Sequence, residues 1–311
     1  MPAADAKRSA EPATKDAAST YFIAGGVAGI VSRTCIAPIE RVKILYQINR
    51  GSSQAWYRIP GQILHNEGVL AFWKGNTAAV VRVMPYMSLT FMSYEEYKVR
   101  CLQLGAAKQA AALGAGSAAG VTAVVLTYPL DLVRARMAMP ESPHTSMFGA
   151  LRTIATERGV GALYHGVGAT CLGVAPYAGL KFMSYEGLKT ALGAFFGISE
   201  EQLRPWQRMG SGLVAGLVAQ TAVYPLDVVR RRMQTQGAAA PLYRSTFHAL
   251  TTIGREEGLR AGLYRGLTIN YLKTMPNVAI YMTLYDIVKL KLLGSSKAAE
   301  TSVGARRSTG L

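Results

Sequence analysis

The sequence has few charged residues, few acids among them, and only three cysteines. Charged residues make up 17% of the 311 residues and hydrophobic residues 50%, whereas an average soluble domain has roughly 25% charged residues. A disordered basic protein would be poor in apolar residues, so the composition excludes that class. Cys35, Cys101 and Cys171 are too few and too scattered for a disulfide framework, and no Cys/His cluster indicates metal. We therefore expect neither a metal site nor a cofactor.

Sequence motifs of catalysis are missing as well. There is no G-x-x-x-x-G-K-[ST] phosphate loop, no H-E-x-x-H and no G-x-S-x-G, and the four histidines stand alone. Gly25, Gly26 and Gly29 resemble a dinucleotide-binding loop, but no strand precedes them, and close helix packing explains them better. We predict that the protein is not an enzyme.

Acids are outnumbered by bases, 18 against 34, which gives a net charge of +16. Such an excess suits a protein that meets anionic lipid, nucleic acid or anionic metabolites. Nucleic-acid binding would explain the charge but not the long apolar segments described below, so no nucleic-acid partner is expected. Residues 1–19 are polar and contain both bases and acids, so no cleavable signal is expected there.

Three short motifs each occur three times in the same order. The motif P-x-[DE]-x-x-[KR] begins at Pro38, Pro129 and Pro225. A second motif, with an acid and a glycine upstream of an aromatic residue, ends at Gly75, Gly166 and Gly266. The third, Tyr-acid-x-x-Lys, places its acid 20 residues after each of these glycines, at Glu95, Glu186 and Asp286. This predicts repeats at 20–104, 105–200 and 201–293, between polar tails at 1–19 and 294–311.

Six long apolar segments lie between the motifs, at about 20–48, 75–101, 109–138, 166–193, 206–234 and 266–293. Each is long enough to cross a hydrocarbon core of about 30 Å as a helix. Polar stretches at about 56–66, 146–157 and 244–255 predict short amphipathic surface helices. The predicted fold is an all-α membrane protein with six transmembrane helices. A soluble helical scaffold is not favoured, because it would show units of roughly 30–50 residues, shorter than these repeats.

This triple set of motifs resembles that of the mitochondrial carrier family, over about residues 20–293. The resemblance implies a threefold pseudosymmetric barrel of six helices around a central cavity, with the short helices on the matrix side. It implies a multi-pass protein of the mitochondrial inner membrane that transports a small metabolite. It also implies a monomer in contact with membrane lipid, for which cardiolipin is a candidate.

The charged residues of the motifs have two readings. Acid and base of one proline motif lie three residues apart, which would allow a local ion pair on one helix. The resemblance implies instead that each acid meets a base of another repeat and closes the cavity. On the matrix side these pairs are Glu40 with Arg134, Asp131 with Arg230, and Asp227 with Lys43. On the cytosolic side they are Glu95 with Lys189, Glu186 with Lys289, and Asp286 with Lys98.

By the same resemblance, a glutamine nine residues after the motif proline braces a matrix-side pair. Gln47 and Gln234 hold this position in two repeats, whereas the remaining repeat has Ala138. The tyrosines before the closing acids, Tyr94, Tyr185 and Tyr285, could brace the cytosolic pairs or serve only as interfacial anchors.

A metabolite lacks threefold symmetry, so its contacts should break the symmetry of the repeats. At one equivalent level stand Arg82, Gly173 and Lys273, and Arg33 is matched by Val124 and Gln220. Arg82 and Lys273 lie in mid-segment with no acid nearby in the sequence, and an intramembrane base indicates function by default. The alternative is that these bases pair with acids or reach toward headgroups.

In the family, a glycine followed by a branched apolar residue at this point of the fourth helix marks carriers of adenine-containing substrates. The resemblance therefore implies an adenine shelf at Gly173 and Val174 beside Tyr177, with Arg33, Arg82 and Lys273 neutralising phosphates. The stretch from Tyr224 to Gln234 looks most like that of the coenzyme A carriers of this family. The expected function is exchange of coenzyme A, dephospho-coenzyme A or adenosine 3′,5′-bisphosphate for ADP- or AMP-type nucleotides. An ATP-Mg/phosphate-type or other adenine nucleotide carrier is the alternative.

Overall fold

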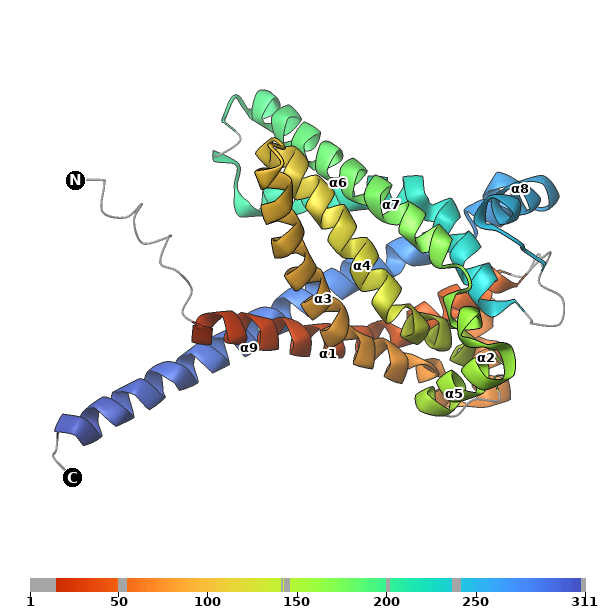
Figure 1. Cartoon of the computed structure of the whole chain (residues 1–311), viewed down its shortest axis with the longest axis horizontal. Coiled ribbons are helices and arrows are strands. Elements are labelled where there is room, and N and C mark those ends of the chain that lie inside the picture. The colour runs from red at the N-terminus through yellow and green to blue at the C-terminus, as the bar shows by residue number, and fades with distance from the viewer. Residues whose placement is uncertain are drawn as a thin grey trace. The chain divides into compact units, whose positions relative to one another are not determined.

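A computed structural model describes residues 15–49, 55–140, 142, 146–199, 202–236 and 242–308 (Figure 1). These residues form helices and short connections, with no strand among them. The predicted all-α fold class is confirmed. Residues 1–14 of the predicted N-terminal tail lie outside the described residues, as do residues 309–311 of the C-terminal tail.

Each repeat contains two long helices with a short helix between them. The first repeat has α1 (Lys15–Ile48), α2 (Ile59–Glu67) and α3 (Asn76–Gln103). The second has α4 (Lys108–Met137), α5 (Met147–Arg158) and α6 (Val167–Phe196). The third has α7 (Pro205–Thr235), α8 (Thr246–Glu256) and α9 (Leu267–Ser308). Short 3₁₀ turns lie at Trp56–Arg58, Val69–Trp73 and Val160–Tyr164, and a π-turn at Leu259–Leu263.

All six long segments predicted from the sequence are helical, but two ends differ. Helix α1 begins at Lys15 rather than near residue 20, and α9 continues to Ser308 rather than ending near residue 293. No proline follows Leu293, and residues 297–300 include alanine, lysine and glutamate, which favour helix. Loss of apolar character therefore marks the end of the apolar segment but not the end of the helix.

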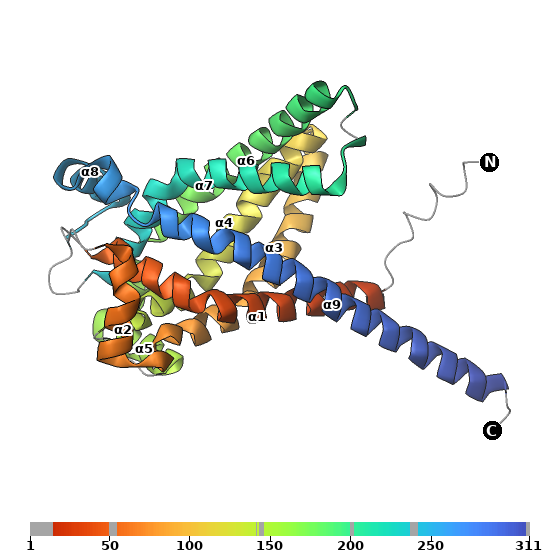
Figure 2. The same cartoon turned by 180° about the vertical axis from the view of Figure 1, so that it is seen from behind.

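The chain divides into two compact units, each of which is described by itself. One comprises residues 1–36 and 274–311, and within it Lys289 Nζ lies 5.1 Å from the centre of the Tyr21 ring. The other comprises residues 37–273. Within this second unit α3 packs along α4, and α6 packs along α7, as Figures 1 and 2 both show.

The second helix of each repeat begins directly after the glycine that ends the second motif. Gly75 and Gly166 have φ of +81° and +84°, in the left-handed region that favours glycine. A Cβ atom at Gly75 would lie only 2.7 Å from the backbone oxygen of Arg134. Backbone conformation and the close approach of α4 therefore both require glycine here, and this contact places the start of α3 against the end of α4.

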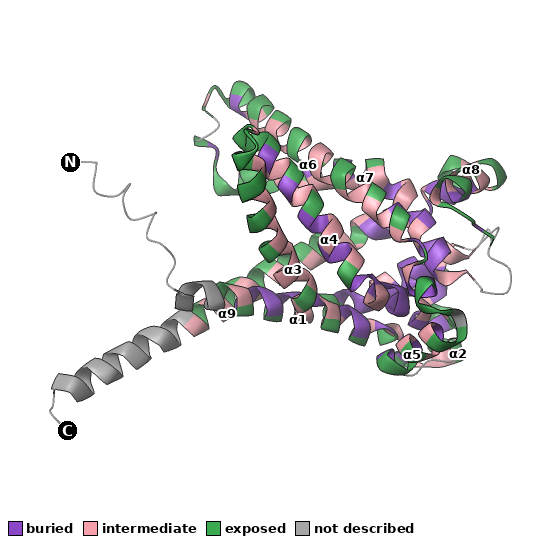
Figure 3. Cartoon of the chain, viewed as in Figure 1, coloured by how far each residue is buried: buried purple, intermediate pink, exposed green. Residues whose placement is uncertain are grey.

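Three buried apolar clusters join the end of a long helix to the short helix of the same repeat (Figure 3). Leu132 of α4 shares a cluster with Ile154 of α5, and Val229 of α7 shares one with Ile253 of α8. The third cluster joins Val42 of α1 to α2. These clusters hold the ends of α1, α4 and α7, which carry the proline motifs.

Three helical segments in the described part of the chain are long and apolar enough to cross a membrane: Tyr21–Ile48, Lys108–Met137 and Pro205–Thr235. They are the first long helices of the three repeats. Along α4, Asp131 is 1% exposed whereas Leu126 is 58% exposed. A charged interior and an apolar surface are the arrangement expected where the surroundings are lipid.

Candidate functional site

The proline motifs of the three repeats meet in the unit formed by residues 37–273. Asp227 Oδ2 lies 2.6 Å from Lys43 Nζ, and Glu40 Oε2 lies 3.3 Å from Arg134 Nη2. Asp131 forms an ion pair with Arg230. In each case the acid is paired with the motif base of another repeat, so the structure holds the three interrepeat pairs implied for the matrix side.

Two of these pairs carry a glutamine and a tyrosine beside them. Gln47 donates from Nε2 to Asp227 Oδ2 at 3.3 Å and to the Tyr224 hydroxyl at 3.0 Å. Gln234 donates in the same way to Asp131 Oδ2 at 2.7 Å and to the Tyr128 hydroxyl at 3.1 Å. Each glutamine therefore bridges a carboxylate and a tyrosine.

The sequence analysis missed the two tyrosines, Tyr128 and Tyr224, that complete the braces. Their hydroxyls donate to the backbone oxygens of His165 and Arg265, at 2.9 and 3.1 Å. Each precedes a motif proline, as Tyr128-Pro129 and Tyr224-Pro225, while the first repeat has Ala37. This repetition in two of the three repeats is the sequence signal that could have found them.

The bases predicted to bind substrate are paired with the same acids. Arg82 Nη1 lies 3.2 Å from Asp131 Oδ1, and Arg82 Nε donates to the Thr127 hydroxyl at 3.0 Å. Lys273 Nζ lies 3.3 Å from Glu40 Oε2. No acid lies near Arg82 or Lys273 in the sequence, but helices distant in the sequence bring an acid to each of them. Asp131 and Glu40 are thus each shared between a motif base and a candidate substrate-binding base.

The remaining predicted substrate residues have varied surroundings. A Cβ at Gly173 would lie 3.7 Å from Leu226 Cδ1, and Val174 packs where Gly120 of α4 has no side chain. Tyr177 is half-buried on α6. Arg33 is exposed in the other compact unit.

Two of the bases predicted for the cytosolic side contact residues of their own helices. Lys98 and Lys189 lie over the rings of Tyr94 and Tyr185, at 5.4 and 5.0 Å from the ring centres, one turn away on the same helix. Lys189 also lies 2.8 Å from Glu186. Glu95 and Asp286 are exposed, and Asp286 belongs with Lys289 to the other compact unit.

A further ionic cluster surrounds Glu67 at the end of α2. Arg41 Nη2 donates to both of its carboxylate oxygens, at 2.8 and 2.9 Å, and Lys74 also donates to it. Burial raises the pKa of the Glu67 carboxyl, but the hydrogen bonds from Lys74 and Arg41 outweigh burial and hold this pKa below its usual value of 4.5.

This pKa predicts a pH-dependent contribution to stability. Because the pKa is lower in the folded protein, ionised Glu67 stabilises the fold above about pH 4.5, and this stabilisation is lost as pH falls through the folded pKa. Glu67→Gln should therefore lower the melting temperature at pH 7, and the difference from wild type should shrink toward pH 4. A difference that does not change with pH would contradict this assignment.

The described residues contain no group of three or more His, Cys, Asp or Glu side chains that could hold a metal ion. What they do contain is a buried set of ion pairs in which Glu40 has two basic partners and Asp131 has three, the third being Arg231 at 3.6 Å. Partly buried ion pairs gain Coulomb energy but lose hydration, so their net stability is small and the partners can be exchanged. Such a set is suited to a contact that must open and close.

Comparison with known proteins finds relatives that match this chain over most of its length. Residues 14–103, 106–195 and 201–296 each match the family described as Mitochondrial carrier protein. The mitochondrial coenzyme A transporter of Homo sapiens is 43% identical over 280 residues, covering 87% of each chain. Mitochondrial carrier protein CoAc2 of Zea mays is 40% identical over 306 residues, covering 91% of this chain and 89% of its own. Mitochondrial substrate carrier family protein P of Dictyostelium discoideum is 40% identical over 278 residues, covering 85% of this chain and 91% of its own.

Proposed function

The chain belongs to the mitochondrial carrier family of multi-pass inner-membrane proteins, and on this premise we propose that it exchanges coenzyme A for adenine nucleotides. Coenzyme A, dephospho-coenzyme A or adenosine 3′,5′-bisphosphate would pass in one direction and ADP- or AMP-type nucleotides in the other. The names of the relatives in Homo sapiens and Zea mays support coenzyme A as the first substrate to test.

The observation that carries the proposal is the sharing of acids between two kinds of base. Lys273 lies 3.3 Å from Glu40, and Arg82 lies 3.2 Å from Asp131. A phosphate that binds these bases would compete with the two carboxylates for them. Substrate that binds Lys273 and Arg82 would therefore take one basic partner away from Glu40 and Asp131, the acids that also pair with Arg134 and Arg230.

This competition links binding to opening. A ligand shifts a conformational equilibrium only by its difference in affinity for the two states. An anion that displaces Glu40 and Asp131 from these two bases binds the two states with different affinities. The state closed on the matrix side must give up those contacts when the anion binds. We propose that the matrix-side pairs open in this way and that the predicted cytosolic residues, such as Lys98 and Lys189, then close the other side.

The decisive experiment is uptake into proteoliposomes preloaded with ADP. Labelled coenzyme A should enter only when a counter-substrate is inside, and unlabelled coenzyme A and adenosine 3′,5′-bisphosphate should compete with it. Uptake of ATP with Mg²⁺, without uptake of coenzyme A, would favour the ATP-Mg/phosphate type of carrier. Uptake from empty vesicles at the same rate would contradict exchange.

We further propose that the carrier acts as a monomer in contact with anionic lipid.

Gly173→Leu should lower transport of adenine-containing substrates, because the new side chain would fill the position proposed for the adenine ring. Gly173→Ala is the matched control: its Cβ would meet Leu226 at 3.7 Å, an ordinary contact, so transport should stay close to wild type. Uptake and melting temperature should be measured together. Normal coenzyme A uptake by a folded Gly173→Leu carrier would show that the adenine ring does not bind at this position.

A further inference from the structure

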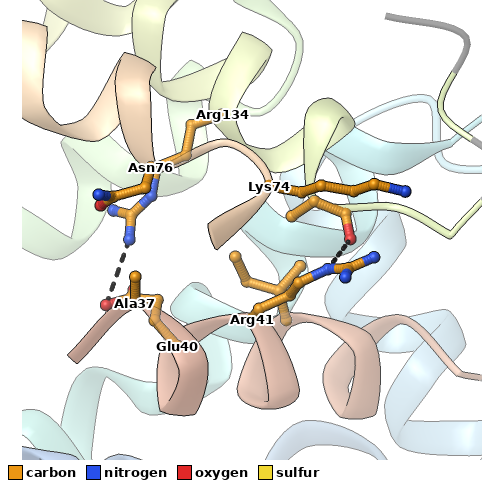
Figure 4. A pocket seen from close by; sticks show the side chains of 8 residues that line it. Ala37, Glu40, Arg41, Lys74, Asn76 and Arg134 are labelled. Carbon is orange, nitrogen blue, oxygen red and sulfur yellow. Dashed lines mark hydrogen bonds and ion pairs between the residues drawn. The ribbon is translucent and has the colours of Figure 1, made fainter. Parts of the chain in front are cut away.

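The shared acid Glu40 has little open space beside it. A small cavity, lined by Ala37, Asn76 and Arg134 among others, has room for about one water molecule, and in Figure 4 Arg134 is directed toward Glu40 next to it. A phosphate group is larger than one water molecule, so this cavity cannot receive it. At this acid a phosphate can bind a base only by taking the place of the carboxylate. A base that exchanges one anion for another needs a further contact that keeps it in place.

Arg82 of α3, at the other shared acid, has such contacts, and their partners carry no charge. Its Nε donates to the hydroxyl of Thr127 on α4 at 3.0 Å, and its guanidinium carbon lies 4.8 Å from the centre of the Tyr86 ring. Its Nη1 lies 3.2 Å from Asp131 Oδ1. The nitrogen next to the aliphatic stem is therefore held by a neutral group, while a nitrogen at the far end of the guanidinium contacts the acid. A phosphate that competes with Asp131 does not compete with Thr127.

The hydroxyl of Thr127 is fixed as an acceptor for Arg82. It donates its one proton to the backbone oxygen of Ala123, four residues earlier in α4, at 2.7 Å. The lone pairs of the hydroxyl oxygen remain for the Nε–H group of Arg82. Thr127 is only 3% exposed, which leaves little room for water as a competing partner. The bond from Arg82 to Thr127 therefore needs no rearrangement of the hydroxyl and is shielded from solvent.

Among the three repeats, only the second has a hydroxyl at this position. Thr127 lies two residues before Pro129, where the other repeats have Ile36 and Val223. At the level of Arg82 the other repeats have a glycine and a lysine, and neither has an Nε–H group to be held in this way. Threonine therefore stands at the one equivalent position that faces an arginine. This departure from threefold symmetry is expected of residues that serve an asymmetric substrate.

We propose that Thr127 is a positioning residue for substrate binding: it holds Arg82 by Nε while the far end of the guanidinium exchanges Asp131 for a phosphate of the substrate. Tyr86 supports the same arrangement from the face of the guanidinium, since an aromatic ring attracts a cation whichever anion is bound at the far end. This inference rests on the proposed function, because it takes Arg82 as a base that binds substrate phosphate. A side chain held in advance loses less freedom when its ligand binds.

The first test compares a variant that lacks the hydroxyl with one that keeps it. Thr127→Val removes the acceptor and nearly keeps the shape. The concentration of coenzyme A for half-maximal exchange should rise about 3- to 10-fold, as for the loss of one hydrogen bond, with a smaller change in maximal rate. Thr127→Ser keeps the hydroxyl and should recover most of the affinity that Thr127→Val loses. In an Arg82→Ala background, Thr127→Val should cause no further rise.

Thr122→Val is the matched control on the same helix. The hydroxyl of Thr122 also donates to the backbone oxygen four residues earlier, and it lies 3.0 Å from the Tyr97 hydroxyl of α3. Thr122 thus joins α4 to α3 without contacting a base through its hydroxyl, and its loss should leave half-saturation unchanged. The proposal is wrong if Thr122→Val raises half-saturation as much as Thr127→Val does, if Thr127→Val matches wild type, or if Thr127→Ser is as weak as Thr127→Val.

The second test uses melting temperatures of the purified carrier and needs no substrate. Thr127→Val and Arg82→Ala, alone and together, form a cycle that measures the coupling of the two residues. The same cycle in an Asp131→Asn background imitates loss of the carboxylate to a phosphate. The coupling should persist there, because Thr127 holds Arg82 independently of Asp131, and a coupling that disappears with Asp131 would overturn the proposal. If Asp131→Asn cannot be purified, the first test decides. If wild type moves none of the nucleotides, the proposed function fails, while the melting cycles still judge Thr127.

Discussion

Asp227→Lys should lower exchange by at least about 100-fold. Lys43 is buried and lies 2.6 Å from Asp227, so the substitution would place two positive charges in contact away from water. Removing one partner of a buried pair costs about 3–5 kcal/mol, and a like charge in its place adds repulsion. In the proposed mechanism the matrix side could then not close, and exchange would fall because it would need a state closed on that side. The initial rate of coenzyme A uptake in exchange for ADP measures the effect.

Reversing both charges, as Asp227→Lys with Lys43→Asp, should recover part of this loss. Recovery should be incomplete because Asn270 and Gln47 are arranged for the original polarity. A matched control is available at the surface, where Glu96 and Arg100 form a pair 2.7 Å apart with both side chains more than half exposed. Reversing Glu96 and Arg100 should change exchange little. A double reversal at positions 43 and 227 that is no better than the worse single variant would show that these residues do not act as a pair.

The second large effect is expected at the bases that share acids with the matrix-side pairs. Lys273→Ala and Arg82→Ala should each raise the coenzyme A concentration for half-maximal exchange by about 10- to 150-fold. This corresponds to about 1.5–3 kcal/mol for a hydrogen bond from a charged donor to phosphate. Lys181 of α6 is exposed, so Lys181→Ala is the control that removes a base without changing the site.

Pairing with Glu40 offers a different explanation for Lys273, and a double variant separates the two. If Lys273 only neutralises Glu40, then Glu40→Gln combined with Lys273→Ala should restore affinity. If Lys273 binds phosphate, the combined variant should remain as weak as Lys273→Ala, because the base is still missing. The half-saturation concentrations of the two single variants and the double variant form the cycle that decides.

The repeats and helices of this protein could be predicted from local sequence alone. Motifs at Pro38, Pro129 and Pro225 mark the repeats, and apolar segments of membrane-crossing length predict the long helices. Local signals were sufficient because a helix satisfies its own backbone hydrogen bonds within a few residues. The end of α9 was misplaced, since apolar character stops near Leu293 but no proline follows, and the helix continues through Gly294 to Ser308.

The candidate site, too, could be predicted only in part from the sequence. The charged residues that could form pairs were visible in the sequence, because an acid or a base inside an apolar segment is conspicuous. The resemblance supplied the pairs between motif residues, but the additional partners of the acids were not predicted. Lys273 is 233 positions from Glu40 (273 − 40), and only the packing of different repeats brings them within 3.3 Å. The tyrosine halves of the braces were missed for the same reason, since Tyr224 gains its role only by contact with Gln47.

Arg41 shows most clearly what tertiary structure decided. In the sequence it is one base beside an acid, in a motif where the next repeats have leucine and valine. In the folded chain its buried guanidinium donates to the backbone oxygen of Ala138, 97 positions away, and to Glu67, 26 positions away. Periodicity and composition report what each segment is made of, and so determine the helices and the repeats. Which partners a buried side chain finds depends on packing between segments, and only the folded chain defines that packing.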